Sequence, residues 1–73
     1  MTLEVLAVFG EYIKTCRRQK KLTQKQLGEM CGYEGRTGER MVQSWERDER
    51  PVPLEKIRPL AKALEIPIDS LIP

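Results

Sequence analysis

The sequence predicts a small all-α domain, and three observations lead to that prediction. Apolar residues recur at spacings of three and four in several segments, which is the pattern of helices with one buried face. Thr23, followed by Gln26 three residues later, is the signature of a helix start. Alternation typical of a strand is confined to the first eight residues, where Leu3, Val5 and Val8 fit either state.

The first predicted helix ends near Lys20, before the start signal at Thr23. Its inner face is marked by Leu6, Phe9, Ile13 and Cys16. The second helix begins after Thr23, whose hydroxyl accepts from a first-turn amide while Gln26 reaches back to the Thr23 backbone. Its predicted inner face holds Leu27, Met30 and Cys31. Gly32 ends this helix, because glycine readily adopts the left-handed conformation that follows a helix.

Residues 33–38 contain two glycines and are predicted to form a long turn before the third helix. Thr37 is the predicted N-cap of that helix, which runs to about Arg47. Asp48 closes it, since Asp tolerates left-handed backbone better than most residues. One face of this helix offers long polar side chains, and the other packs into the core. The polar face holds Arg40, Gln43, Ser44 and Arg47, and the apolar face holds Met41, Val42 and Trp45.

Pro51 and Pro53 form an extended link to a fourth amphipathic helix. Its apolar repeat consists of Leu54, Ile57, Leu60, Ala61 and Leu64. Pro59 lies inside this repeat and lacks a backbone donor, which predicts a kink or a displaced helix start. Pro67 opens a final helical turn. The apolar side of that turn is Ile68, Leu71 and Ile72.

Composition excludes several classes of function. The chain has 73 residues, 40% of them hydrophobic, which suffices for one small core but not for the layers that usually enclose a substrate pocket. The absence of histidine excludes a histidine-based triad and a zinc finger. No apolar run spans a membrane, no signal peptide is recognisable, and Cys16 and Cys31 are predicted to be free buried thiols. We therefore expect a cytoplasmic protein that is not an enzyme and needs no metal or cofactor.

The net charge of +2 conceals an uneven distribution. Between residues 12 and 25 there is no acidic residue, and the basic ones are Lys14, Arg17, Arg18, Lys20, Lys21 and Lys25. Such a stripe suits phosphate binding, and a solvated helix face is the alternative. The order of a short capped helix, a glycine-containing turn and an amphipathic helix is that of a helix-turn-helix, whose second helix enters the major groove of DNA.

Five stretches of sequence carry a resemblance to a known family. They are Ile13-Lys14-Thr15-Cys16-Arg17, Leu22-Thr23-Gln24-Lys25-Gln26-Leu27, Gln43-Ser44-Trp45-Glu46-Arg47, and Leu60-Ala61-Lys62-Ala63-Leu64 with Asp69-Ser70-Leu71-Ile72. In this order and spacing, residues 9–72 resemble the Cro and lambda-repressor-like helix-turn-helix proteins, also called the Xre family. The resemblance implies a five-helix, lambda-repressor-like DNA-binding domain over residues 9–73, after an N-terminal extension of residues 1–8.

The resemblance also implies roles for individual residues. Positions that read bases are matched by Arg40 and Ser44, with Glu39, Gln43 and Thr37 nearby. Positions that contact DNA phosphates are matched by Gln24 and Arg47, with Thr23, Lys25 and Arg36 as further candidates. Arg17 and Glu46 match an ion pair between the first and third helices. The segment between Gly32 and Trp45 is about four residues longer than in the family, which predicts a lengthened turn before the recognition helix.

The implied function is sequence-specific binding of double-stranded DNA by a homodimer on a palindromic operator, with repression of transcription as the result. Dimer contacts are expected from the final turn, at Ile68, Leu71 and Ile72, and the N-terminal extension is the competing surface. The alternative function is a protein-interaction module of the same fold, for example an antitoxin. That alternative draws on the acidic pair Asp48 and Glu49. The host is expected to be a bacterium or a phage.

Overall fold

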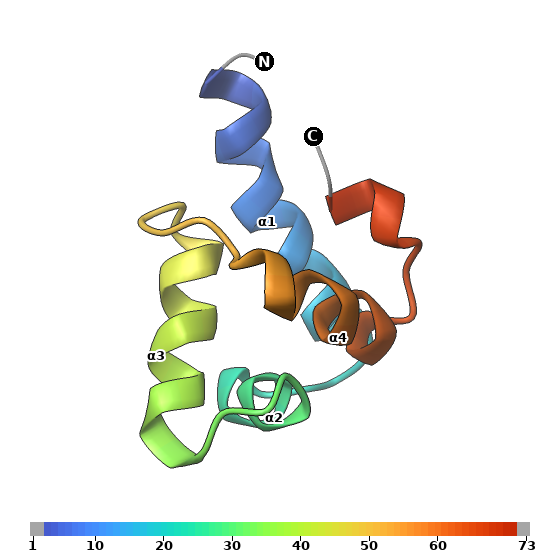
Figure 1. Cartoon of the computed structure of the whole chain (residues 1–73). Helices are drawn as coiled ribbons and strands as arrows, with labels where there is room; N and C mark the ends of the chain where they lie inside the picture. Colours follow the sequence, from blue (N-terminus) through green and yellow to red (C-terminus); the bar gives the residue numbers. More distant parts are fainter. Residues whose placement is uncertain (1–2, 72–73) are drawn as a thin grey trace.

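A computed structural model describes residues 3–71, with side chains from residue 10 onward, and these residues form four α-helices and a short 3-10 helix (Figure 1). The elements are α1 (Leu3–Gln19), α2 (Gln24–Met30), α3 (Gly35–Glu46), α4 (Leu54–Leu64) and η1 (Ile68–Leu71). The all-α prediction is confirmed. The expected count of five helices is not confirmed, because the last element within residues 3–71 is a 3-10 helix of only 4 residues.

The core lies where α1, α2, α3 and α4 meet. Its buried apolar side chains are Ile13, Cys16, Leu27, Cys31, Val42, Trp45, Ile57, Leu60, Ala61, Ala63, Leu64 and Leu71. Trp45 is the largest of them and is only 1% exposed. The indole N–H of Trp45 has no hydrogen-bond acceptor among the described residues. Burial of Trp45 therefore stabilises the core through the apolar area of its ring.

Two apolar residues that the sequence placed on inner faces are exposed instead. Met30 is 51% exposed and Leu54 is 87% exposed. In α2 the inward arc is set by Leu27, Gly28 and Cys31, and Met30 falls outside that arc at 100° per residue. Leu54 is the first residue of α4, where the helix has only begun to approach the core.

Helix α1 begins at Leu3, so residues 3–8 continue the same helix as residues 9–19. Its N-terminal end extends beyond the body of the molecule (Figure 1). The predicted inner-face residues Leu6 and Phe9 lie outside the described side chains, whereas Ile13 and Cys16 are buried as expected. At Gly10 the helix crosses the end of α3 closely, because a Cβ there would lie 2.5 Å from the Glu46 carbonyl oxygen.

Helix α2 begins and ends as the sequence predicts. The Gln26 backbone N–H donates to Thr23 Oγ1 at 3.0 Å, and the Thr23 backbone N–H donates to Gln26 Oε1 at 2.8 Å, which completes the capping box. After the C-cap residue Cys31, Gly32 has a φ of +96°, a conformation that favours glycine. The predicted left-handed Asp48 after α3 is also present, with a φ of +58°.

The turn between α2 and α3 is short, which corrects the predicted long turn. Helix α3 begins at Gly35, so Arg36, Thr37 and Gly38 belong to its first turn and Thr37 is not its N-cap. The N-cap is Glu34, whose side chain makes no capping hydrogen bond. The physical reason is a helix–helix contact: a Cβ on Gly28 would lie 2.5 Å from the Gly38 Cα. Gly38 is therefore a packing position inside a helix, and the extra residues lengthen α3.

Helix α4 runs from Leu54 to Leu64 with Pro59 inside it, so the expected displacement of its start does not occur. It is tied to the α2–α3 turn through Lys56. The Lys56 Nζ donates to the Cys31 carbonyl oxygen at 3.0 Å and lies 4.5 Å from the centre of the Tyr33 ring. Tyr33 in turn packs against Trp45, with 6.0 Å between ring centres. These contacts hold the turn against the core.

Candidate nucleic-acid interface

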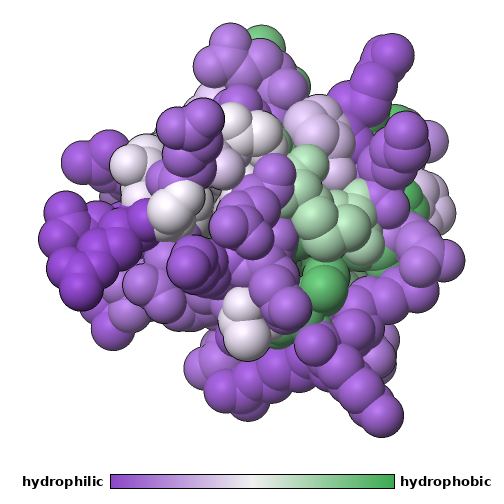
Figure 2. All heavy atoms as spheres, turned by 90° about the horizontal axis from the view of Figure 1, so that it is seen from below, coloured by the Kyte–Doolittle hydropathy of each residue, from purple (hydrophilic) through white to green (hydrophobic). Residues whose placement is uncertain are grey.

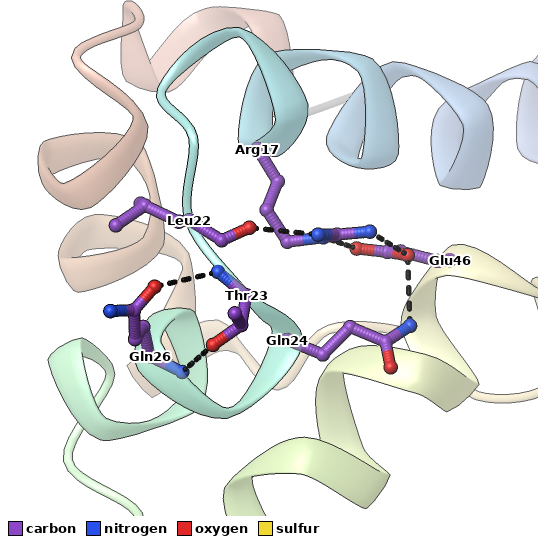
Figure 3. Close-up of polar contacts among 6 residues, drawn as sticks. All are labelled: Arg17, Leu22, Thr23, Gln24, Gln26 and Glu46. Atoms are coloured by element: carbon purple, nitrogen blue, oxygen red, sulfur yellow. Dashed lines mark hydrogen bonds and ion pairs between the residues drawn. The ribbon is translucent and has the colours of Figure 1, made fainter.

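Arg17 and Glu46 form a buried ion pair that joins α1 to the last turn of α3 (Figure 3). The Arg17 Nε donates to Glu46 Oε2 at 2.6 Å, and Nη2 donates to Oε1 at 3.2 Å, so the guanidinium fork faces both carboxylate oxygens. The Arg17 Nη1 donates to the Leu22 carbonyl oxygen at 2.8 Å. The side chains are 11% and 3% exposed respectively. The pair thus fixes α1, α3 and the link before α2 in one arrangement.

Gln24 connects the start of α2 to the same carboxylate. Its Nε2 donates to Glu46 Oε1 at 3.1 Å, as Figure 3 shows. An amide nitrogen has two hydrogens, so one contact leaves a donor available. Gln24 is half-buried, and the capping box at Thr23 fixes the backbone just before it. The first turn of α2 is therefore held rigidly beside α3.

A cleft of about 470 Å³ lies next to this network, between α1, the start of α2 and α3. Its lining residues are Lys14, Arg17, Arg18, Thr23, Gln24, Glu39, Gln43, Glu46 and Arg47. Glu46 is engaged by Arg17, whereas Lys14, Arg18 and Arg47 take no part in the ion pairs among the described residues. The hollow therefore carries an excess of positive charge, which suits an anionic ligand.

Helix α3 presents a stripe of long polar side chains on the side that faces away from the core. At 100° per residue, Arg36, Arg40, Gln43 and Arg47 fall within roughly 60° of one another. The three arginines are exposed and Gln43 is half-buried. From Arg36 to Arg47 the stripe extends about 16 Å along the axis at 1.5 Å per residue.

Figure 2 shows the molecule from below, the side on which α2 and the first turn of α3 lie in Figure 1. Hydrophilic residues cover most of this face, and an apolar patch interrupts them. The large apolar side chains exposed in the described part of the chain are Met30 and Leu54. The polar character of the face agrees with a surface that meets a hydrated, charged partner.

The structure brings together only some of the residues that the sequence predicts to contact DNA. Those that line the cleft are Thr23, Gln24, Glu39, Gln43 and Arg47. Arg36, Thr37 and Arg40 are exposed on α3, and Lys25 is exposed on α2, all outside the cleft lining. Ser44 is half-buried, and its Oγ donates to the Met41 carbonyl oxygen at 2.8 Å.

Sequence reasoning missed Lys14 and Arg18 as site residues. They lie four residues apart on α1 and line the cleft opposite α3. The signal was present, because residues i and i+4 share a helix face and both belong to the basic run. The sequence does not show which face of α1 borders the recognition helix. That follows from the Arg17–Glu46 pair.

The α2–α3 turn contains two ionisable groups with displaced pKa values, Cys31 and Tyr33. Burial raises the pKa of the Cys31 thiol from 9.0 to about 11, an effect that the Lys56 charge partly opposes. Burial, followed by the nearby Cys31 and Glu55, raises the pKa of Tyr33. Both cysteines are buried and free, as the sequence predicts. A thiol with this pKa stays protonated at neutral pH, so Cys31 is a packing residue rather than a reactive one.

The family model that describes helix-turn-helix proteins of the Cro/C1 type matches residues 13–71. The chain belongs to this family. Its members are DNA-binding domains, and the match includes α2, the turn, α3 and the residues of the ion pair. No curated protein and no solved structure matches the chain.

None of the helices within residues 3–71 combines the length and apolar character that crossing a membrane requires. In the same part of the chain, no group of three or more His, Cys, Asp or Glu side chains is placed to hold a metal ion.

Proposed function

We propose that the protein is a cytoplasmic repressor of transcription that binds specific sequences in double-stranded DNA. In this proposal it binds as a homodimer on a palindromic operator. One observation carries the proposal: α3 presents an exposed arginine-rich face while α1 and α2 fix its other side. A rigid helix with long donors along one face fits the major groove, which is about 12 Å wide. Membership in a DNA-binding family supports the same partner.

In this proposal α3 supplies the base contacts. The Arg40 guanidinium donates to O6 and N7 of a guanine, which is the commonest specific side-chain contact in the major groove. Gln43 suits adenine, and Glu39 suits the amino group of cytosine. Ser44 and Thr37 complete the set of proposed base contacts. The Ser44 hydroxyl already donates to its own helix, so it would act on DNA as an acceptor.

The proposed phosphate contacts gather around the cleft. Gln24 and Thr23 stand at the start of α2, and Lys25 follows them on the exposed side of that helix. Arg47 borders the cleft from α3, and Lys14 and Arg18 border it from α1. A DNA strand passing this cleft would meet donors from α1, α2 and α3 at once, which positions α3 without reading sequence.

A homodimer follows from the small reach of one recognition helix. One helix reads only a few base pairs, and two related by a twofold axis read two half-sites about 34–36 Å apart. The symmetry of the operator would then mirror the symmetry of the protein. Of the dimer contacts predicted from the sequence, Leu71 is only 1% exposed within its own chain, and Ile72 lies outside the described residues.

The test is an electrophoretic shift with a random duplex and with a selected site, each over a salt series. Contacted phosphates make the logarithm of the affinity fall with the logarithm of salt concentration, by about 0.9 per phosphate. Arg40→Ala is expected to weaken the selected site by roughly 1–3 kcal/mol and to change the random duplex far less. Arg47→Gln should weaken both equally. A wild-type protein whose affinity does not depend on salt would contradict the proposal.

The alternative of a protein-interaction module loses part of its support in the structure. Asp48, one of the acidic residues behind it, accepts a hydrogen bond from the Gly10 backbone N–H at 3.1 Å through its Oδ1. Asp48 therefore ties α1 to the end of α3. The exposed Met30 and Leu54 are the observation that still favours a protein partner. The same shift experiment separates the two functions, because a module that only binds proteins would not retard duplex DNA.

A further inference from the structure

The first turn of α3 differs in character from the rest of the helix. It consists of Gly35, Arg36, Thr37 and Gly38, so Arg36 is its only long side chain. A Cβ at Gly35 would meet nothing within 4 Å, and Gly38 packs on Gly28. Residues 35–38 therefore form a slim tip of α3, in which only Thr37 and the exposed Arg36 have side chains. A slim tip can approach the floor of the major groove more closely than a turn that carries several bulky side chains.

The contact between Gly28 and Gly38 also fixes the register of that tip. The backbones of α2 and α3 touch at these two residues, and a Cβ on Gly28 would lie 2.5 Å from Gly38. Because the α2–α3 turn is short, the position of α3 relative to α2 is determined from its N-terminal end. In helix-turn-helix proteins the N-terminal residues of the second helix contact base edges. Arg36 is the second residue of α3.

The charges around Arg36 decide between a base and a phosphate as its target. The exposed carboxylate of the N-cap Glu34 lies at the tip, and that of Glu39 follows one turn after Arg36, where it also borders the cleft. Apart from Glu39, the cleft holds four basic side chains and one acidic one, Glu46, which Arg17 engages. A phosphate at the tip would lie beside two like charges, whereas the O6 and N7 of guanine are neutral acceptors that these carboxylates repel far less.

We propose that Arg36 is a base-reading residue that recognises a guanine, in addition to Arg40, and that it does not contact a phosphate as the sequence indicated. This inference rests on the proposed function. Arg36 and Arg40 lie on one helix face, about 6 Å apart along the axis, and successive bases are about 3.4 Å apart. The two arginines therefore select two guanines within about two base-pair steps of each other in each half-site. The extra turn of α3 is what makes room for the second reading position.

The experiment selects binding sites from a random duplex library with wild-type protein, Arg36→Ala, Arg36→Lys and Arg40→Ala. Arg58→Ala, an exposed arginine on α4, is the matched control. The wild type should enrich two guanines per half-site, and each alanine variant should lose the preference at one of them. The affinity of Arg36→Ala for the wild-type site should fall roughly 5- to 150-fold, with its salt slope unchanged.

Arg36→Lys separates the two kinds of contact, because lysine keeps the charge and lacks the planar fork. Base reading predicts that Arg36→Lys loses most of the guanine preference, whereas a phosphate contact would leave this variant close to wild type. The inference is overturned if Arg36→Ala weakens all duplexes equally with a salt slope lower by about 0.9, or if it changes nothing. A wild-type protein that enriches no sequence would overturn the proposed function itself. Circular dichroism verifies that each variant is folded.

Discussion

At the scale of single residues, Glu46 connects the stability of the domain to the surface proposed to face DNA. Its carboxylate accepts from Arg17 and Gln24 while only 3% of its side chain is exposed. Removing it would leave the Arg17 guanidinium buried without its anion. The position of the α2 start and the shape of the cleft both depend on this one acid. We therefore expect stability and DNA binding to be coupled at Glu46, which the proposed function does not place in contact with DNA.

We expect Glu46→Ala to lower the free energy of unfolding by roughly 3–5 kcal/mol, the usual cost of leaving one partner of a buried pair uncompensated. Urea unfolding followed by circular dichroism measures it. Glu49→Ala is the control, because Glu49 is exposed just beyond the same helix and its loss should change stability by less than about 0.5 kcal/mol. Equal unfolding midpoints for wild type and Glu46→Ala would show that the pair contributes nothing.

The raised pKa of Cys31 predicts that the stability of the protein falls at alkaline pH. Its pKa is raised from 9.0 to about 11 by burial, so below pH 9 the thiol is protonated in both the folded and unfolded states. Between pH 9 and 11 the unfolded thiol ionises first, and the free energy of unfolding falls as pH rises, by about 2–3 kcal/mol in total. Cys31→Ala should reduce this alkaline slope without abolishing it, because the pKa of Tyr33 is raised too. An unchanged slope in Cys31→Ala would refute the assignment.

At the scale of elements, the contact between α2 and α3 sets the geometry of the helix-turn-helix. Gly28 and Gly38 let the two helix backbones touch, and Tyr33 and Lys56 close the turn beside them. No other pair of helices is joined at a point where two glycines face each other within residues 10–71. The orientation of the arginine stripe on α3 therefore depends on two residues that have no side chain.

Gly28→Ala should destabilise the protein although it replaces glycine in a helix. Alanine favours helix by up to about 1 kcal/mol, but its Cβ would lie 2.5 Å from the Gly38 backbone, which cannot move without shifting α3. We expect a net loss of roughly 1–3 kcal/mol in thermal or urea unfolding. Gly38→Ala should cost less, since its nearest contacts are 3.0 Å away. Glu29→Ala, exposed on α2, is the control; a stabilised Gly28→Ala would disprove the close contact.

Prediction from the sequence succeeded where local signals decide the structure, and it failed where the contact between Gly28 and Gly38 decides it. Local signals were sufficient for the capping box at Thr23 and for the left-handed Gly32, because neighbouring residues determine both. The start of α3 was placed too late because Gly35 and Gly38 are typical turn residues. Only the long-range approach of Gly28 shows that Gly38 lies inside a helix. Sequence patterns report local preferences, and packing between distant segments can reverse them.

For the candidate site, the sequence was sufficient for the pair Arg17 and Glu46, because the family resemblance matched both positions. It was insufficient for Lys14 and Arg18, because their role depends on which side of α1 borders the cleft. The burial of Leu71 was missed for a similar reason. A short terminal turn with three apolar residues gives no sign of whether they pack on their own chain or on a partner.

At the scale of the whole molecule, the arrangement separates two sides. The cleft lies between α1, the start of α2 and α3, and Gln43 and Arg47 of the arginine stripe line it. In Figure 1, α4 and η1 lie to the right of α3, and both pack on the core. A dimer that leaves the DNA-facing residues free must therefore use a surface outside them. The final turn offers less surface for a dimer contact than the sequence suggests. Leu71 is buried in the core of its own chain, and Ile68 is half-buried against that core.

Leu71→Ala distinguishes a core residue from a subunit contact. Because Leu71 is a core residue that is 1% exposed, Leu71→Ala should lower the free energy of unfolding by roughly 2–5 kcal/mol. That is a large share of the stability of so small a domain. The melting temperature should then fall at every protein concentration, and sedimentation should show no change in association before unfolding. Ile68→Ala, which removes a half-buried side chain of the same element, should cost less. If Leu71 instead contacted a second subunit, Leu71→Ala would melt like the wild type at low concentration and lose cooperative binding to a palindromic duplex.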